Sequence, residues 1–255
     1  MTISSSLKQN RILAGLPSAD YARLLPDLEQ VSIPAGERIY KPDVRITHLY
    51  FPIDCIIAAL NVLQNGAVIR ISITGNEGMI GLSHILGYEH SRVQAVALTE
   101  GKAFRIRAPL IKKEFNSGSA LRHMLLRFTH ALIMQMGHIA VGARDHTIVQ
   151  QLCHFLLMIL DRLSGNELHI THKQLSIFLG ANRESITLAV QKLETTGAIH
   201  HKRGHLTVVN RQELEDRVGG SYTMVTNEYQ RLQHYTALQR LPLGAKEKGM
   251  GTHAE

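Results

Sequence analysis

Three consecutive residues of the sequence, Arg183-Glu184-Ser185, carry side chains that suit the edges and backbone of DNA. An arginine can grip the O6 and N7 atoms of guanine with two hydrogen bonds, and a glutamate can accept one from the amino group of cytosine. A serine hydroxyl, together with the free N–H groups of a first helical turn, can hold a phosphate. At the start of a helix, this triplet predicts contact with the major groove.

Two predicted helices and a hairpin would position this triplet. Thr171 can cap a first helix, Gly180 allows the tight turn after it, and Asn182 can cap a second helix. The second helix has an apolar face at i, i+3, i+4, i+7 spacing, made of Ile186, Ala189, Val190 and Leu193. Residues 197–209 then alternate like a two-stranded wing with a basic tip. This order predicts a winged helix-turn-helix.

The predicted DNA contacts fall into two groups. The residues expected to contact bases are Arg183, Glu184 and Thr187. The residues expected to contact the backbone are Thr171, Lys173, Ser185, Lys192, Lys202 and Arg203. A helical hairpin whose polar face is merely solvated is the alternative interpretation, and the basic wing that follows the second helix favours DNA.

Composition permits a polyanionic partner without locating its site. The formal net charge is +7, but residues 100–163 alone carry nine Lys/Arg against four Asp/Glu, so most of the excess lies before the predicted winged helix. Cys55 and Cys153 lack CxxC spacing and favour a reducing compartment. The start of the sequence lacks the features of a signal peptide, and no apolar run reaches transmembrane length. We expect a cytoplasmic protein without a membrane partner.

The segment from about residue 31 to residue 107 predicts a barrel or sandwich of short strands. The β-like runs are 31–33, 38–40, 48–51, 56–63, 68–73, 93–98 and 103–106. Asn65-Gly66, between two apolar runs, predicts a hairpin. Within 68–73, Val68, Arg70 and Ser72 would point one way and three isoleucines the other, as in a half-buried strand. Short helical pieces are expected before this segment, in residues 7–29.

Two helices are expected after the strands. The first, from about Gly118 to Val141, has an apolar seam in steps of four and three, made of Leu121, Leu125, Phe128, Leu132, Gln135 and Ile139. The seam could pack on the chain's own strands or on a second copy, and the spacing leaves both interpretations open. The second helix is expected from about Asp145, as its cap, to Leu163, and Ser164-Gly165-Asn166 would end it at a domain boundary.

Over about residues 10–215 the chain resembles the cyclic-AMP receptor protein/FNR (Crp/Fnr) superfamily of bacterial regulators. The family's recognition helix begins with Arg-Glu-Thr or a close relative, which Arg183-Glu184-Ser185 matches; Leu188 departs from the third basic residue that some members use. In the N-terminal half, residues 34–42 match the opening strand-turn signature, and residues 75–82 fall where the phosphate-binding cassette should lie.

The resemblance implies an α+β fold with an N-terminal cyclic-nucleotide-binding-like β-roll (a jelly roll), a long dimerisation helix and a C-terminal winged helix-turn-helix. The expected divisions are 1–117, 118–143, 144–217 and a C-terminal extension, 218–255, with a possible helix at 221–238 and a disordered end from about 244. The resemblance also implies a homodimer on a near-palindromic operator in double-stranded DNA, with RNA polymerase as a further candidate partner. The residues assigned to the dimer helix are Leu121, Leu125, Phe128, Leu132 and Ile139.

The expected effector pocket, Gly81, Leu82, Ser83 and Arg92, departs from that of nucleotide binders. Gly81-Leu82 stands where a Gly-Glu pair would hold the ribose, so the carboxylate is lost, and Ser91-Arg92 reverses the Arg-Ser pair that would hold the cyclic phosphate. A buried ribose hydroxyl would lose its partner, so we expect no tight binding of cyclic AMP. An iron–sulfur cluster is not expected either, because only one cysteine lies in the first half. The effector is left unknown.

Two other classes of function compete with a DNA-binding regulator. One is a small-molecule-binding module whose winged helix binds another protein. The other is an enzyme, which is not expected because the sequence has no Walker loop, no Gly-x-Ser-x-Gly and no HExxH motif. No metal site is expected among the fifteen histidines, because those on the first long helix at i, i+7 or i+8 would be roughly 10–12 Å apart in rise.

Overall fold

The computed structural model describes residues 9–64, 66–220, 222, 227 and 229. The predicted N-terminal helical pieces are present as α2 (Arg11–Ala14), α3 (Ser18–Leu24) and the short 3-10 helix η2 (Leu25–Asp27). The expected extension helix at 221–238 lies outside the described residues except for three positions, and the expected disordered end lies wholly outside them. Within the described part of the chain, no helix is long and apolar enough to span a bilayer.

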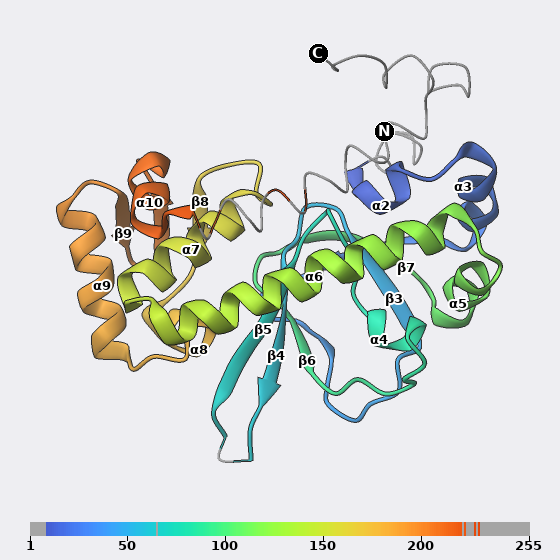
Figure 1. The fold of residues 1–255 in the computed structure, drawn as a ribbon, viewed down its shortest axis with the longest axis horizontal. Helices are drawn as coiled ribbons and strands as arrows, with labels where there is room; N and C mark the ends of the chain where they lie inside the picture. Colours follow the sequence, from blue (N-terminus) through green and yellow to red (C-terminus); the bar gives the residue numbers. More distant parts are fainter. Residues whose placement is uncertain (1–8, 65, 221, 223–226, 228, 230–255) are drawn as a thin grey trace, which may run out of the picture.

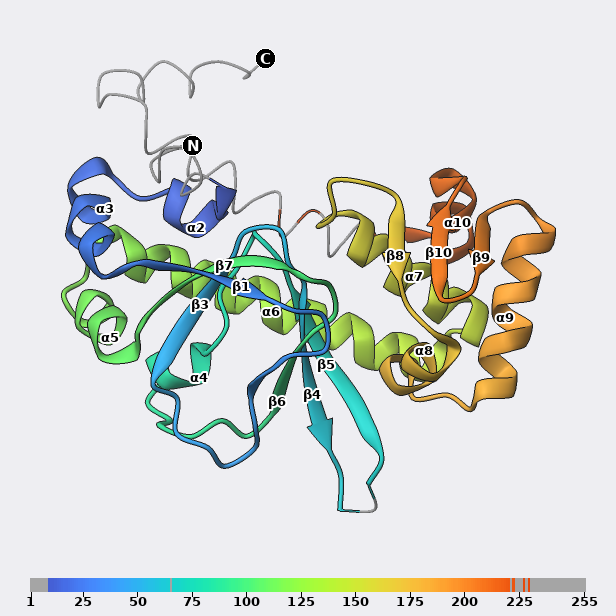
Figure 2. The same ribbon diagram turned by 180° about the vertical axis from the view of Figure 1, so that it is seen from behind.

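The predicted β-roll is confirmed. Its strands are β1 (Glu29–Ile33), β2 (Arg38–Tyr40), β3 (His48–Pro52), β4 (Ile57–Val62), β5 (Val68–Thr74), β6 (Gln94–Ala97) and β7 (Gly101–Arg107). They form antiparallel sheets in the orders β1-β7-β3 and β2-β6-β4-β5, the first of which faces the viewer in Figure 2. The hairpin predicted at Asn65-Gly66 is confirmed, because β4 pairs with β5 on either side of it.

The alternation predicted for β5 is present over residues 69–72, but its polarity is reversed there, and Ser72 is buried while Ile71 is half-buried. Arg70 is buried, whereas its neighbour Ile69 is exposed. Arg70 lies against Phe155 of helix α7 (Ile148–Leu160), which comes from the C-terminal half of the chain. The side of β5 that carries Arg70 is therefore covered by a part of the chain that the local pattern could not reveal.

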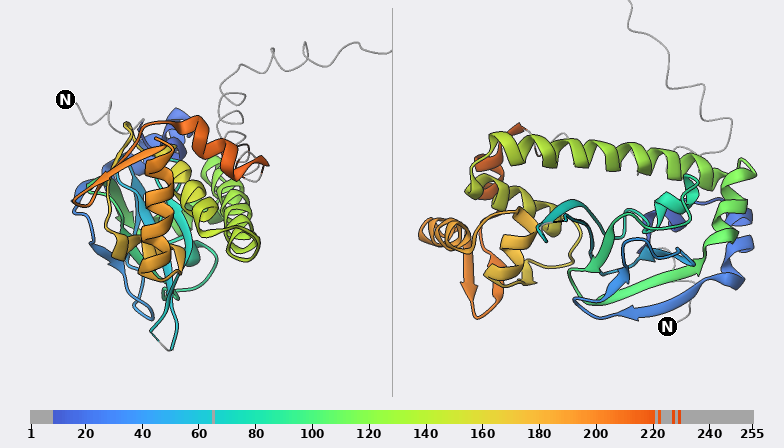
Figure 3. Two further views of the ribbon diagram at one scale, coloured as in Figure 1. Left: turned by 90° about the vertical axis from the view of Figure 1, so that its left-hand side faces the viewer. Right: turned by 90° about the horizontal axis from the view of Figure 1, so that it is seen from below.

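The long helix α6 (Ala120–Asp145) runs along one side of the molecule, from the β-roll to the C-terminal half (Figures 1 and 3). The short helices α4 (Leu82–Ile85) and α5 (Ala108–Asn116) precede it. Gln135, in the middle of its apolar seam, is buried and accepts a hydrogen bond from the backbone N of Ile73 at 2.8 Å while donating one to the oxygen of Ile73 at 3.0 Å. The polar residue in the seam thus fastens the helix to β5.

The seam assigned to a dimer contact faces the chain's own β-roll, which corrects that assignment. Leu121, Leu125 and Phe128 are fully buried in the β-roll core, and Leu132 packs against the same core; only Leu132 and Ile139 of the five stay half-buried. A second apolar stripe on the outer side of α6 is exposed, and its members are Leu126, Ile133, Gly137, Ala140 and Val141. Both sides of α6 thus carry apolar residues at helical spacing, so the sequence pattern alone could not show which side faces the β-roll.

The C-terminal half contains α7, β8 (Glu167–His169), α8 (His172–Leu179), α9 (Arg183–Thr195), β9 (Ile199–Lys202), β10 (His205–Val208) and α10 (Arg211–Val218). The predicted cap of α7 is wrong. Asp145 ends α6 instead, and Thr147 caps α7 in a reciprocal capping box with Gln150, which satisfies two backbone N–H groups at once. The wing is also larger than expected, because β8 joins β10 and β9 in one antiparallel sheet.

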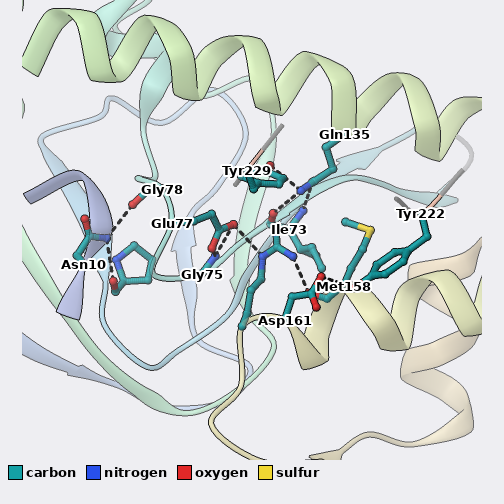
Figure 4. A network of polar contacts seen from close by, with 12 residues as sticks. Asn10, Ile73, Gly75, Glu77, Gly78, Gln135, Met158, Asp161, Tyr222 and Tyr229 are labelled. Carbon is teal, nitrogen blue, oxygen red and sulfur yellow. Dashed lines mark hydrogen bonds and ion pairs between the residues drawn. The ribbon is translucent and has the colours of Figure 1, made fainter. Parts of the chain in front are cut away.

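A second hydrophobic core joins the two halves of the molecule. It contains Ile56, Ala58 and Ile73 of the β-roll together with most of α7 and the buried faces of α8 and α9. Beside it lies a buried ion pair, in which Arg162 Nε and Glu77 Oε1 are 2.8 Å apart and the two side chains are 5% and 4% exposed. Figure 4 shows Glu77 close to Gln135 and Tyr229, beneath α6. This polar network ties the C-terminal half to the β-roll.

Candidate nucleic-acid interface and effector cavity

The turn between α8 and α9 is built by three local devices. Thr171 and Gln174 form a capping box at the start of α8, with Gln174 N donating to Thr171 Oγ1 at 3.2 Å and Thr171 N donating to Gln174 Oε1 at 2.9 Å. Gly180 ends α8 in the left-handed region at φ 64°. Asn182 Oδ1 accepts from Ser185 N at 2.8 Å and starts α9. The predicted order of cap, turn and cap is present.

Helix α9 buries one face and exposes the other. The buried residues are the four predicted ones, Ile186, Ala189, Val190 and Leu193. Arg183 and Glu184 are exposed in the first turn. Ser185 and Thr187 are half-buried, and Thr187 Oγ1 donates to Arg183 O at 2.9 Å and lies 3.0 Å from His172 Nδ1. Of the predicted base contacts, Arg183 and Glu184 are therefore the more accessible.

The wing presents its basic residues at a tight turn. Lys202 pairs with His205, so the loop consists of Arg203 and Gly204, both with positive φ, at 52° and 83°. Ile170 N donates to Gly204 O at 2.8 Å, which places the tip beside the start of α8. The other predicted backbone contacts on the two helices, Lys173 and Lys192, are exposed as well. The predicted backbone cations are thus exposed on α8, on α9 and at the wing turn.

Two features of this surface were not singled out as sites by the sequence. Leu188 is 62% exposed on α9, one turn beyond Glu184, where a leucine side chain can pack on a thymine methyl group. The rings of His172 and His201 stack with centroids 4.6 Å apart, joining α8 to the wing. Burial and the neighbouring His201 lower the pKa of His172. The sequence shows that histidines are numerous, but only the fold brings His172 and His201 together.

A cavity of about 310 Å³ lies between the β-roll and α6. Gly81, Leu82 and Ser83, three of the four residues expected in an effector pocket, line it. The fourth predicted residue, Arg92, does not; its side chain is exposed and forms an ion pair with Asp43 at 3.1 Å. The remaining lining is apolar or hydroxyl-bearing, and α6 contributes Thr129, Leu132, Ile133 and Met136.

Gly81 is required by its surroundings. Its φ is 100°, and a Cβ atom would lie 2.4 Å from Leu49 Cδ2 and 2.6 Å from the Tyr40 hydroxyl. The Tyr40 hydroxyl donates to the backbone oxygen of His48. Burial raises the pKa of Tyr40, so this hydroxyl stays neutral. No charged side chain lines the cavity among the residues that the structure describes.

The described residues were also considered as metal ligands and as reactive thiols. Within that part of the chain, no cluster of three or more His, Cys, Asp or Glu side chains has the geometry of a metal site. Cys55 and Cys153 are both buried and free, and burial raises the pKa of each thiol to about 12. Thiols in this state are poor nucleophiles and poor metal ligands.

Comparison with known proteins assigns both halves. Residues 30–117 match the cyclic nucleotide-binding domain, and residues 150–217 match the Crp-like helix-turn-helix domain. Together the two models match more than half of the chain, which belongs to the Crp/Fnr family of transcription regulators and carries a DNA-binding helix-turn-helix. The comparison with curated protein sequences found no match.

Solved structures share this fold across both domains. FixK2 from Bradyrhizobium japonicum is 17% identical, with a TM-score of 0.65 over 76% of this chain and 98% of that one. A putative regulator of the crp/fnr family from Eubacterium rectale is 20% identical, with a TM-score of 0.62 over 81% and 97%. The c-di-GMP responsive regulator CLP of Xanthomonas campestris is 15% identical, with a TM-score of 0.60 over 75% and 99%.

Proposed function

We propose that the chain is a homodimeric, sequence-specific DNA-binding regulator that is controlled at the β-roll by something other than cyclic AMP. One observation carries the proposal: α9 begins at a capped turn, exposes Arg183 and Glu184 there, and lies beside a basic wing tip. This is the arrangement in which a recognition helix enters the major groove while neighbouring cations hold the backbone. The proposed divisions are those expected from the sequence, with 144–217 as the DNA-binding part.

Selection of bound fragments from genomic DNA tests this function. A dimer with two recognition helices should enrich a near-palindromic motif whose half-sites are about one helical turn apart. Recovery of no motif, with no salt-dependent affinity for duplex DNA, would contradict the proposal and favour a winged helix that binds protein. The motif would also assign the bases that face Arg183, Glu184 and Leu188.

The outer stripe of α6 is the proposed dimer contact. Leu126, Ile133 and Val141 are 46%, 55% and 55% exposed on a helix that lies at the edge of the molecule (Figure 3). A second copy of α6 packed along this stripe would remove these side chains from water, in the manner of a coiled coil. Because Ile133 also lines the β-roll cavity, occupancy of the cavity can reach the dimer contact directly.

Substitution of Ile133 by Asp tests the dimer. A carboxylate buried without a partner at the contact should weaken the dimer by about 100-fold or more, measured by analytical ultracentrifugation. The control is Val209→Asp, which places the same charge on an exposed residue of the C-terminal half. An unchanged monomer–dimer equilibrium in Ile133→Asp would contradict this contact. The dimer contact would then lie on another face of the chain.

The proposed control by something other than cyclic AMP rests on the lining of the β-roll cavity. A cyclic phosphate buried there would face hydroxyl and apolar groups, while the only arginine expected for it, Arg92, is turned to solvent. Burying a charge without a cation or a full set of donors is costly. Titration calorimetry with cyclic AMP should therefore detect no binding at micromolar concentrations, and micromolar or tighter affinity would overturn this part of the proposal.

A further inference from the structure

A second cavity, of about 300 Å³, lies at the junction of the two halves, and we call it the hinge cavity. It is formed by the outer part of β5, the last turns of α6, the start of α7 and the end of α8; Figures 1 and 2 show β5 passing beside α8 at this place. Its polar lining includes Arg70, His138, His146 and His154. Among the described residues, no acidic side chain lines it.

Arg70 is the unusual member of this lining. It is 6% exposed, and its Nε and Nη1 atoms have no hydrogen-bond partner among the described residues. Its guanidinium lies 4.7 Å from the centre of the Phe155 ring, which attracts a cation but does not satisfy its N–H groups. Burial, followed by the nearby Arg162, lowers the pKa of Arg70 to about 10, so the side chain is still a cation at neutral pH.

Arg162, whose side chain is also buried, has the hydrogen-bond acceptors that Arg70 lacks. Arg162 has Glu77 as an ion-pair partner at 2.8 Å and also donates to Met158 O at 2.6 Å. Glu77 in turn accepts from Gly75 N, so both members of that pair are satisfied within the protein. A buried guanidinium with open N–H groups costs free energy until an acceptor reaches it, and a carboxylate or phosphate is the acceptor that fits its planar fork.

The histidines suit the same ligand. His154 is 6% exposed and its Nε2 atom has no partner among the described residues, while burial and Arg70 lower its pKa to about 3. A neutral imidazole can donate one hydrogen bond without adding a buried charge. His138 also lines the cavity, and its Nδ1 atom is 2.8 Å from Met134 O within the same helix. His146, the C-cap residue directly after α6, lines the cavity at the hinge itself.

We propose that the hinge cavity binds a small oxyanion, with Arg70 as its principal ligand and the lining histidines as secondary ones. The volume suits inorganic phosphate or a small dicarboxylate. Ligands would come from the β-roll through Arg70 and from the hinge through His146, and the cavity reaches Gly180, the residue that ends α8 just before the recognition helix. A bound anion would therefore hold the DNA-binding half against the β-roll.

The test is isothermal titration calorimetry with inorganic phosphate and, separately, with succinate, at constant ionic strength set by chloride and without DNA. The expected result is saturable binding of one anion per chain. The Arg70→Met variant, which removes the charge but keeps a long apolar side chain, should bind at least tenfold more weakly. The control Arg92→Met, which removes an exposed arginine of the same domain, should bind as the wild type does.

A second readout uses the wild-type protein alone and does not depend on how the variant folds. The ring-proton NMR signals of His138 and His154 should shift during the phosphate titration with the same midpoint as the heat. Binding of phosphate only, succinate only, or both would each support the oxyanion site and would state which group it prefers. No saturable binding of either probe, or equal affinity in a folded Arg70→Met variant, would overturn the inference without affecting the proposed DNA binding.

Discussion

The β-roll cavity and the hinge cavity have nearly the same volume and both contact α6, but their linings differ in charge. The β-roll cavity, about 310 Å³, meets the middle of α6 and is lined by apolar and hydroxyl-bearing side chains. The hinge cavity, about 300 Å³, meets the end of α6 and holds a buried arginine with three histidines. The buried arginine without an acidic partner therefore lies in the hinge cavity, while the arginine expected in the β-roll pocket faces solvent.

The two cavities contact different parts of α6, so a ligand in each would affect the DNA-binding half in a different way. The β-roll cavity includes Ile133 of the proposed dimer stripe, so its occupant would act on how two copies pack. The hinge cavity includes the residues that end α6 and α8, so its occupant would act on the orientation of the recognition helix within one chain. Separate signals could therefore be combined in one regulator.

The largest expected effect contrasts the two buried arginines. Glu77→Gln leaves Arg162 as a buried charge without its partner and should lower the free energy of unfolding by about 3–5 kcal/mol, measured by chemical denaturation. Arg70→Met, which removes a charge that has no such partner, should leave the stability equal or raise it. Equal destabilisation by both substitutions would contradict the distinction between a paired and an unpaired arginine.

A control for that experiment is available on the surface. Glu29 pairs with Arg105 at 2.8 Å, but its side chain is largely exposed. Glu29→Gln should therefore lower the free energy of unfolding far less than Glu77→Gln does, because water screens the pair. A loss as large as that of Glu77→Gln would show that burial is not what makes the Arg162 pair important.

The next effect concerns the pH dependence of the hinge. The pKa of His154 is about 3 in the folded chain, below the ordinary value of 6.5, so the unfolded chain takes up a proton first as the pH falls. The free energy of unfolding should then drop by about 2 kcal/mol between pH 7 and pH 5 through this group alone. In His154→Gln that part of the drop should disappear, whereas the exposed control His200→Gln should keep it. Identical pH profiles for His154→Gln and the wild type would argue against a buried, neutral imidazole.

The smallest expected effect concerns DNA binding by the wing, the activity that both cavities would control. Lys202→Ala removes one exposed cation beside the wing turn and should weaken DNA binding about equally for all sequences. The slope of log affinity against log salt concentration should become shallower by about one, measured by fluorescence anisotropy at several salt concentrations. Lys41→Ala, an exposed lysine of the β-roll, should leave the slope unchanged. A sequence-dependent loss in Lys202→Ala would instead place this side chain on bases.

Local signals in the sequence were enough for most elements of the fold. The Asn-Gly turn predicted the β4–β5 hairpin, and Thr171, Gly180 and Asn182 predicted the turn before the recognition helix, because caps and turns depend on a few adjacent residues. The start of α7 was missed by two residues. Both Asp145 and Thr147 can cap a helix, and only the reciprocal bond with Gln150 decides between them.

Features that depend on distant parts of the chain were not predictable in the same way. Helix α6 carries apolar residues on two sides, and only the position of the β-roll shows that Leu125 lies inside and Ile133 outside. Arg70 was expected on an alternating strand, but its burial depends on α7, which is about 80 residues away in the sequence. Arg92 was placed in the pocket by its position in a motif, whereas its side chain pairs with Asp43 on the surface.

The most direct test of DNA recognition by α9 compares the wild type with Arg183→Ala on the selected operator and on single-base variants of it. We expect a loss of roughly 1–3 kcal/mol in specific affinity, together with relaxed selection at one base pair, because one bidentate contact to a base is removed. Arg38→Ala, an exposed arginine in β2, should behave as the wild type. Unchanged affinity and unchanged base preference in Arg183→Ala would contradict the assignment of α9 as the recognition helix.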